Sequence, residues 1–176
     1  MSSKQQIMTK QDIQRTLTRM VHEILELNKD LDNLVIVGIR TRGAYLAERI
    51  AKKIGKIGKI DIPLGMLDIT LHRDDLDLNN KMPIVNETDI PFDVTDKNII
   101  LIDDVLFSGR TIRAALDEIM DFGRPRKIQL AVLIDRGHRE LPIKADYIGK
   151  NVYTTMTESI GVRIKEVDKK EEVFKI

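Results

Sequence analysis

An apolar run that ends in two carboxylates constrains this chain most. Residues 98–111 read Asn-Ile-Ile-Leu-Ile-Asp-Asp-Val-Leu-Phe-Ser-Gly-Arg-Thr. Residues 99–102 have the length and β-branched content of a buried parallel strand, and Asp103 and Asp104 follow them. From Ile112 onward the apolar residues recur at helical spacing. The stretch therefore predicts a strand, an acidic pair, a tight turn and a helix, in that order.

The turn at residues 107–111 has the composition of a phosphate-binding loop. Such a turn presents backbone N–H groups and the positive end of a helix dipole to the space above a sheet. Gly109 lets the backbone approach an anion closely, and the Ser108 and Thr111 hydroxyls can donate to phosphate oxygens. The two carboxylates would repel a phosphate, so we expect them to accept hydrogen bonds from neutral hydroxyls such as a ribose diol. A ribose 5-phosphate would satisfy both halves, whereas the Gly-x-x-x-x-Gly-Lys-Ser/Thr sequence of a P-loop is absent.

The order of strand, polar exit and helix occurs elsewhere in the chain. Residues 34–39 form a continuous apolar run, followed by apolar residues at helical spacing that end before Gly55. Residues 127–134 form another apolar run with the character of a buried strand. This alternation predicts an α/β fold in which a mainly parallel sheet is flanked by helices.

The exits of these strands should meet at one edge of the sheet. In an open α/β sheet, ligands bind outside the carboxyl ends of the strands, so residues 40–43, 103–111 and 135–139 should lie close together. Arg40 and Arg42 flank the first exit beside a helix N-terminus, an arrangement that suits a second, more highly charged anion. The alternative is that both are ordinary surface arginines.

Two further segments complete the predicted organisation. Residues 11–28 predict an amphipathic helix whose polar face is either an ordinary solvated surface or a binding patch. Residues 62–70 predict a third strand, and the polar residues 71–96 form a connection long enough to be a mobile lid over a reactive site. Near the end of the chain, residues 161–167 have the character of a strand.

Length and composition bound the class of protein. A chain of 176 residues is expected to form a single domain over residues 1–176, with a hood and tail from about residue 135. Its 29 basic and 28 acidic residues give a net charge of +1, so nucleic-acid binding would need a local patch. The absence of cysteine excludes disulfides and thiolate catalysis. The amino terminus lacks an apolar signal core and no apolar run is long enough to span a membrane, so we expect a cytoplasmic protein with no membrane partner.

Residues 99–111 resemble the phosphoribosyl pyrophosphate (PRPP) motif of type I phosphoribosyltransferases. The resemblance implies the type I phosphoribosyltransferase fold, with a flexible loop and a small hood, and it implies that Asp103 and Asp104 hold the ribose hydroxyls. Residues 40–43 resemble the family's pyrophosphate loop, which commonly contains a strained non-proline peptide, so Arg40 and Arg42 complete the catalytic candidates. The implied PRPP- and nucleotide-binding residues are Thr41, Gly43, Arg73, Val105, Leu106, Phe107, Ser108, Gly109, Arg110 and Thr111. Mg²⁺ is the implied cofactor, carried mainly by PRPP without direct protein ligands.

The segment Asp-Arg-Gly-His-Arg-Glu-Leu-Pro-Ile at residues 135–143 resembles one branch of this family. Members of that branch regulate pyrimidine operons and are also uracil phosphoribosyltransferases, and with the amino-terminal helix the similarity covers nearly the whole chain. His72 and Tyr153 depart from the branch, which usually has an aromatic residue and a proline at these positions. Phe107 stands where purine-specific members place an Asp, and because it cannot act as an acid or base it favours a pyrimidine acceptor.

This branch implies a reaction and a regulatory role. Uracil nitrogen would displace pyrophosphate at the sugar C1 through an oxocarbenium-like transition state, which gives UMP with inversion. The implied uracil-binding residues are Asp135, Arg136, Gly137 and His138. The implied RNA-binding residues are Thr18, Arg19, His22, Arg139, Lys144, Lys150 and Thr154. The implied partners are PRPP, uracil, UMP and the leader mRNA of pyrimidine genes, through transcription attenuation, in a homodimer or homohexamer.

Two alternatives to this function stay open at this point. One is a purine-salvage phosphoribosyltransferase without an RNA role, and the other is a nucleotide-sensing RNA regulator that does not turn over. A DNA-binding repressor would need an added winged-helix domain, for which the chain begins too close to its first core helix, so no DNA partner is expected.

Overall fold

The computed structural model describes residues 4–70 and 87–176, and these residues form two sheets. The larger sheet has five strands in the order β3-β2-β4-β5-β6, and every neighbouring pair is parallel. These strands are β2 (Leu34–Ile39), β3 (Leu64–Leu67), β4 (Asn98–Leu106), β5 (Lys127–Asp135) and β6 (Tyr147–Asn151). The predicted parallel sheet is therefore confirmed.

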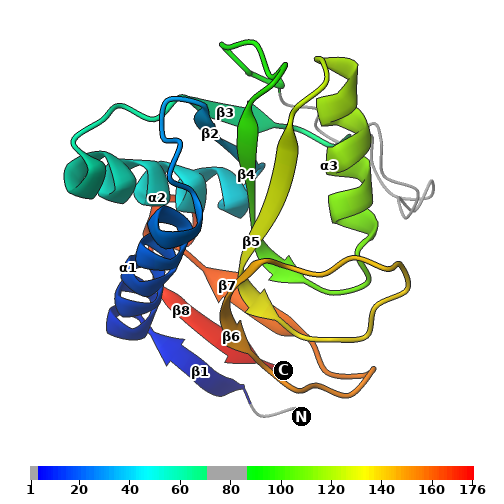
Figure 1. Cartoon of the computed structure of the whole chain (residues 1–176). Coiled ribbons are helices and arrows are strands. Elements are labelled where there is room, and N and C mark those ends of the chain that lie inside the picture. Colours follow the sequence, from blue (N-terminus) through cyan, green and yellow to red (C-terminus); the bar gives the residue numbers. More distant parts are fainter. Residues whose placement is uncertain (1–3, 71–86) are drawn as a thin grey trace.

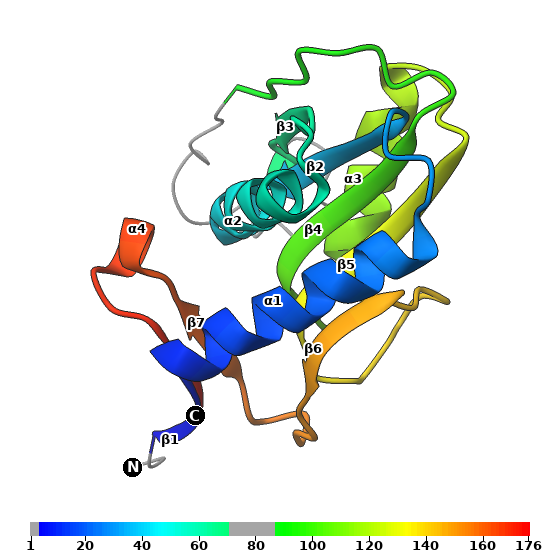
Figure 2. The ribbon, with the colours of Figure 1, turned by 60° about the vertical axis from the view of Figure 1, so that its left-hand side comes forward.

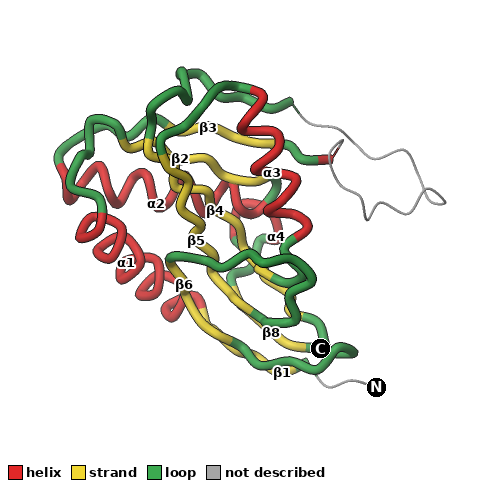
Figure 3. Tube along the Cα trace, turned by 45° about the vertical axis from the view of Figure 1, so that its right-hand side comes forward, coloured by secondary structure: helices red, strands yellow, loops and turns green. Residues whose placement is uncertain are grey.

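Helices cover both faces of this sheet. Helices α1 (Lys10–Leu27) and α2 (Arg42–Gly58) lie on one face, and α3 (Arg110–Asp121) lies on the other (Figures 1 and 3). One buried apolar cluster joins α1 and α2 to the sheet, and a second joins α3 to the opposite face. The strands β2, β4 and β5 are buried on both sides, which explains their continuous apolar sequence.

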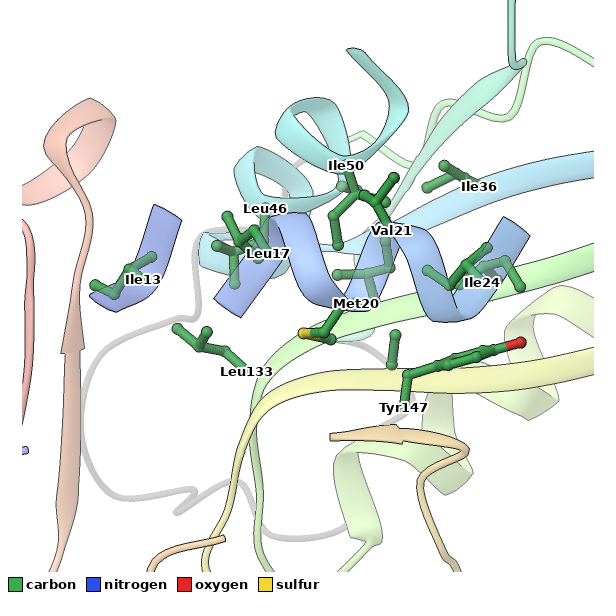
Figure 4. Close-up of a cluster of buried hydrophobic side chains, with 14 of the residues drawn as sticks. Ile13, Leu17, Met20, Val21, Ile24, Ile36, Leu46, Ile50, Leu133 and Tyr147 are labelled. Carbon is green, nitrogen blue, oxygen red and sulfur yellow. The ribbon is translucent and has the colours of Figure 1, made fainter. Parts of the chain in front are cut away.

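Helix α1 buries the apolar stripe that its sequence predicts. Thr9 caps it, because the Thr9 hydroxyl accepts a hydrogen bond from the Asp12 amide at 3.2 Å and the Asp12 carboxylate accepts one from the Thr9 amide at 2.9 Å. The buried residues of the stripe are Ile13, Leu17, Met20, Val21 and Ile24, which pack between α2 and the strands (Figure 4). Full burial of such a side chain stabilises the fold by about 1.5–3 kcal/mol relative to exposure, so the stripe fixes which face of α1 turns outward.

A second, three-stranded sheet was not predicted. Its order is β1-β8-β7, formed by β1 (Gln5–Thr9), β7 (Ile160–Arg163) and β8 (Glu172–Lys175), with antiparallel pairing throughout. It brings both ends of the chain together (Figure 2). The carboxyl-terminal strands β7 and β8 therefore share their sheet with an amino-terminal strand.

Several predicted boundaries are wrong for identifiable reasons. Strand β3 ends at Leu67 rather than residue 70, since the Asp68 carboxylate accepts a hydrogen bond from the Thr70 amide at 2.8 Å and turns the chain. The strand predicted over residues 161–167 divides into β7 and the short helix α4 (Lys165–Asp168). Helix α2 continues past Gly55 to Gly58, where Lys59 adopts a left-handed conformation and caps it.

The predicted lid falls mostly on residues outside the described part of the chain. Residues 71–86 are among these, and they include Arg73. Its predicted carboxyl-terminal portion, however, belongs to the core. Asp89 exchanges two backbone hydrogen bonds with Met66, at 2.7 and 2.8 Å, and Val94 is fully buried beside α3 residues. The lid therefore cannot extend to residue 96.

No helix in residues 4–70 and 87–176 combines the length and apolar character that crossing a membrane requires.

Candidate functional site

A crevice opens where β2 and β4 separate. The β2–β4 pairing ends at Gly38 and Ile102, whereas β4 stays paired with β5 as far as Leu106. Strand β3, which follows β2 in the chain, lies on one side of β2, and β4 lies on the other side. The space between β2 and β4 is therefore a topological switch point of the sheet. Ligands of open α/β sheets bind at such points, outside the carboxyl ends of the strands.

A cavity of about 340 Å³ occupies this position. It brings together residues from the first two predicted exits, together with the end of β3. Its lining residues are Ile39, Arg40, Thr41, Arg42, Asp68, Ile69, Thr70, Asp103, Asp104, Val105 and Thr111. The cavity thus combines arginines from the β2 exit with carboxylates from β4 and from the end of β3, as a ligand with both anionic and hydroxyl groups would require.

The acidic pair lies within β4 and not after it, contrary to the sequence prediction. The strand continues because its β5 side stays hydrogen-bonded, while its β2 side is free to line the crevice. Asp103 is buried, and its Oδ1 accepts a hydrogen bond from the Asp104 amide at 2.9 Å. Burial raises the pKa of Asp104 above its ordinary value, and the nearby positive charge of Arg42 opposes part of this rise. The site therefore holds a carboxylate whose charge is costly until a ligand satisfies it.

The loop at residues 40–43 joins β2 to α2. Its Arg40–Thr41 peptide is cis, in agreement with the strained peptide implied by the family resemblance. Gly43 is required here by close packing between the start of α2 and β4. A Cβ at Gly43 would lie 2.6 Å from the Ile102 carbonyl oxygen, so only glycine lets the start of α2 approach β4 this closely.

The two arginines of this loop have different partners among the described residues. The Arg40 Nε donates to the Glu87 carbonyl oxygen at 3.1 Å. Arg42 forms a bidentate ion pair with Asp168, with Nε–Oδ2 at 3.1 Å and Nη2–Oδ1 at 2.7 Å. Nothing in the sequence pattern pointed to Asp168 as part of this site.

The phosphate-type loop precedes α3 as predicted, although α3 begins at Arg110 and so includes Thr111. Gly109 has φ +93°, a left-handed conformation that favours glycine. The Ser108 Oγ accepts from the Arg110 amide at 3.3 Å, and Arg110 Nε donates to Glu140 at 2.6 Å. Of the predicted binding residues in this stretch, Val105 and Thr111 line the cavity; Leu106, Phe107, Ser108, Gly109 and Arg110 lie beyond it at the strand exit.

The third exit meets the other two at the same sheet edge but lines a separate cavity. Arg136 is buried, lies 4.2 Å from the centre of the Phe107 ring, and donates to the Glu158 carbonyl oxygen at 2.7 Å. This cavity of about 210 Å³ is lined by Asp135, Arg136, Gly137, Arg139, Asn151, Val152 and Tyr153. His138 lies outside this lining and contacts the Thr154 carbonyl oxygen at 2.5 Å.

Arg139, one of the predicted RNA-binding residues, holds this loop together. Its guanidinium donates to Asp135 at 2.5 Å, to the Phe107 carbonyl oxygen at 2.8 Å and to the Ile143 carbonyl oxygen at 2.9 Å. Thr154 is likewise engaged, since its hydroxyl accepts from Arg136 Nε at 3.2 Å.

Two of the other predicted RNA-binding residues, Arg19 and Lys150, lie where α1 meets β6. The Arg19 Nη2 donates to the carbonyl oxygens of Ile148 and Gly149, at 3.1 and 2.6 Å, so the polar face of α1 meets β6. Lys150 follows directly on β6, and its Nζ donates to the Ile7 carbonyl oxygen at 3.3 Å. The remaining members of the set are His22 and Lys144, which are exposed, and Thr18, which is half-buried and accepts a hydrogen bond from Lys53.

Asp68 and Thr70 are site residues that sequence reasoning missed. Both line the main cavity, and Asp68 is buried. They were assigned to a strand interior because residues 62–70 were interpreted as one strand. The sequence signal for this part of the site is Asp68 itself, a carboxylate that directly follows the strand Leu64–Leu67.

Comparisons with known proteins identify the family. The phosphoribosyl transferase domain matches residues 3–166. A protein of Pelotomaculum thermopropionicum named bifunctional protein PyrR is 58% identical over 170 residues, which cover 97% of this chain and 94% of that one. A Deinococcus radiodurans protein of the same name is 54% identical over 165 residues, covering 94% and 90%.

Solved structures show the same fold. A hypoxanthine phosphoribosyltransferase of Trypanosoma cruzi superposes with a TM-score of 0.73 at 13% identity, covering 96% of this chain and 89% of that one. The expected type I phosphoribosyltransferase fold is thereby confirmed. The chain belongs to the phosphoribosyl transferase domain family, within the group of bifunctional PyrR proteins.

Proposed function

We propose that this protein forms UMP and pyrophosphate from uracil and PRPP, and that it also binds the leader mRNA of pyrimidine genes under the control of uridine nucleotides. Membership of the bifunctional PyrR group supports two activities. One observation carries the enzymatic half of the proposal: Asp103 and Asp104 share a cavity at the switch point of the sheet with Arg42 and the N-terminus of α2.

Different residues of the cavity recognise the hydroxyl groups and the charged groups of PRPP. Asp103 and Asp104 accept hydrogen bonds from the ribose hydroxyls, and the loop before α3 binds the 5-phosphate through backbone N–H groups and Thr111. Arg40 and Arg42 stabilise the negative charge that develops on the departing pyrophosphate. Uracil nitrogen attacks C1 as the C1–oxygen bond to pyrophosphate breaks, and the nitrogen's proton leaves to solvent. Positioning of the two reactants supplies the remainder of the catalysis.

Mg²⁺ is expected to accompany PRPP in this cavity. Among the residues that the structure describes, no cluster of three or more carboxylates and histidines is arranged to hold a metal ion, so Mg²⁺ would be bound mainly by PRPP oxygens and by the waters that it commonly keeps. When bound with PRPP, Mg²⁺ neutralises charge on the pyrophosphate oxygens. Asp103 and Asp104 orient the sugar and leave the metal to be carried by the substrate.

The loop at residues 135–138 is the proposed reader of uracil. Its side chains are largely committed to holding the loop, since Asp135 pairs with Arg139 and Arg136 donates to the segment before β7. Backbone groups are therefore left as the main donors and acceptors toward the base. Phe107, under the Arg136 guanidinium, provides an apolar neighbour and no proton-transferring group.

The RNA half of the proposal rests on the surface where α1 meets β6. Arg19 of α1 donates to the Gly149 carbonyl oxygen across 130 positions of sequence, directly before Lys150 of β6, and Thr18 and His22 lie on the same helix as Arg19. Local positive charge can bind RNA phosphates even though the chain's net charge is only +1. We place the protein in the cytoplasm, where PRPP and mRNA occur, and expect it to act as a homodimer or homohexamer.

The enzymatic proposal is tested by acceptor specificity. Purified protein mixed with PRPP, Mg²⁺ and one base at a time should release pyrophosphate with uracil. Hypoxanthine and guanine should be poor acceptors, because Phe107 cannot manage a purine proton. Faster turnover with either purine than with uracil would contradict the assignment.

A further inference from the structure

The Asp168 carboxylate on helix α4 is held by a hydrogen bond within its own segment as well as by Arg42. Asp168 Oδ2 accepts a hydrogen bond from the Ile164 amide at 2.9 Å, at the start of the same short helix. The same carboxylate accepts from Arg42 Nε at 3.1 Å and from Nη2 at 2.7 Å. A bidentate pair fixes the plane of a guanidinium as well as its distance. Asp168 therefore determines how Arg42 is presented.

A second arginine of α2 fastens the same region. The Arg49 Nε and Nη2 atoms donate to the two carboxylate oxygens of Glu166, at 2.9 and 2.6 Å, and its Nη1 donates to Glu171 at 2.5 Å. Arg42 and Arg49 lie seven positions apart, which places them on one face of α2. Arg42 lines the main cavity and Arg49 does not, so two similar ion pairs differ in their relation to the site.

We infer that Asp168 is a positioning residue for the pyrophosphate end of PRPP, which it serves by holding the Arg42 guanidinium in its binding orientation. This inference rests on the proposed function of Arg42. Asp168 engages Nε and Nη2, so the Nη1 N–H groups stay outside this pair and can donate to an anion. A long arginine side chain loses rotamer freedom when it binds, and a carboxylate that has already oriented it removes that cost from the binding step.

Two carboxylates favour the positive charge of Arg42. The Asp168 hydrogen bond raises the pKa of Arg42 above its ordinary value, and the negative charge of Asp104 acts in the same direction. Loss of Asp168 would free the side chain to swing toward Asp104 and away from the pyrophosphate position.

The test is steady-state UMP synthesis with PRPP varied at saturating uracil. Asp168→Asn should raise the KM for PRPP about tenfold, the loss expected for a charge-assisted contact, with a smaller change in kcat. Asp168→Glu should recover most of the affinity, because it keeps the carboxylate. Glu166→Gln is the matched control: it breaks an ion pair of the same helix to Arg49 and should leave the KM within about twofold.

A double-mutant cycle makes the assignment specific. In an Arg42→Ala background, Asp168→Asn should add nothing to the KM, because the group it positions is gone. An unchanged or lower KM in Asp168→Asn would overturn the inference, the lower value meaning that Asp168 competes with pyrophosphate for Arg42. An equal rise in Glu166→Gln would also overturn it, since α4 would then matter only as a support.

Direct binding of pyrophosphate with Mg²⁺, measured by calorimetry, separates this inference from the proposed function. Wild-type protein that binds pyrophosphate but makes no UMP would refute the enzymatic proposal, and Asp168→Asn would still have to weaken binding about tenfold. Thermal unfolding of each variant reports whether it folds. If Asp168→Asn does not fold, Asp168→Glu decides the question: wild-type affinity supports the inference, and a loss equal to that of Arg42→Ala contradicts it.

Discussion

Gly43 in α2 and Asp103 in β4 are in backbone contact: a Cβ at Gly43 would lie 3.1 Å from the Asp103 Cα. The loop that is proposed to bind pyrophosphate is therefore fixed directly against the strand that is proposed to bind ribose. The two halves of the ligand would meet a single rigid unit, in which the spacing between arginine and carboxylate is set by backbone packing.

This contact predicts that Gly43→Ala is damaging. The added methyl group would overlap the Ile102 carbonyl oxygen and push α2 away from β4, at a cost of about 1–3 kcal/mol in the free energy of unfolding. UMP synthesis should fall at least about tenfold, because a displacement of this size misplaces Arg42 relative to Asp104. Denaturant unfolding and steady-state kinetics measure the two effects.

Gly58→Ala provides the control at the other end of the same helix. There the nearest atoms to an added Cβ are side-chain carbons of Ile60 and Leu31, at 3.3 and 3.4 Å, which can move. This variant should keep its activity. Wild-type activity in Gly43→Ala would show that the close approach is not needed.

Asp104→Asn should separate activity from stability. Ribose contacts and charge stabilisation depend on the carboxylate, so the rate should fall about a hundredfold or more. Stability should change in the opposite direction. Burial raises the pKa of Asp104 in the folded protein, so the folded state binds the proton more tightly than the unfolded state and stability falls as pH rises through the carboxyl range.

The neutral amide avoids this cost at pH 7. Asp104→Asn should therefore unfold at a temperature higher than wild type at pH 7, by about 2–4 °C for each kcal/mol gained. The difference should shrink as pH falls from the raised pKa of folded Asp104 toward the pKa of the unfolded carboxyl, and it should vanish below the latter, where the carboxyl is neutral in both states. A variant that is less stable than wild type at pH 7 would show that Asp104 is a structural charge.

RNA binding should depend on the surface where α1 meets β6. His22→Ala and Lys150→Ala remove exposed groups from that surface, and each should weaken binding of the leader RNA while leaving UMP synthesis within about twofold of wild type. Lys150→Ala should also reduce the salt dependence of binding by about one unit of slope, because one phosphate contact is lost. The measurement is RNA affinity at several salt concentrations.

Lys127→Ala is the control for general loss of charge. Lys127 is exposed at the start of β5, at the amino ends of the strands, whereas Lys150 lies near the carboxyl end of β6. Equal losses in Lys127→Ala and Lys150→Ala would mean that RNA responds to net charge and not to this surface. Arg19 is a poorer test, since its guanidinium also holds Ile148 and Gly149 in place.

Local sequence patterns predicted the buried strands and the amphipathic helices, whose character follows from their own residues. Residues 34–39 are apolar without interruption because β2 is buried on both faces, and its predicted bounds agree with the structure. The end of β4 was predicted too early, because Asp103 and Asp104 read as an exit although the β5 side of the strand stays paired. Strand β1 was missed, since Gln5 and Gln6 are exposed and only Met8 is buried.

The site was predictable only to the extent that its residues are clustered in the chain. The sequences of residues 40–43 and 103–111 each indicate a loop at the end of a strand. Because the strands are parallel, these two loops lie at the same edge of the sheet. Asp168 could not be found in this way, because it pairs with Arg42 across 126 positions and its own segment resembles a continuing strand. This pairing depends on how α4 packs against α2, where Arg42 and Arg49 both form ion pairs with it.

The most direct test is the affinity of the purified protein for its own operon leader RNA, measured with and without UMP. Saturating UMP should tighten RNA binding about tenfold in the wild-type protein, and Asp104→Asn, which weakens the ribose contact, should need more UMP for the same effect. An RNA affinity that is the same with and without UMP, in a protein that still makes UMP, would contradict the proposal that uridine nucleotides control RNA binding.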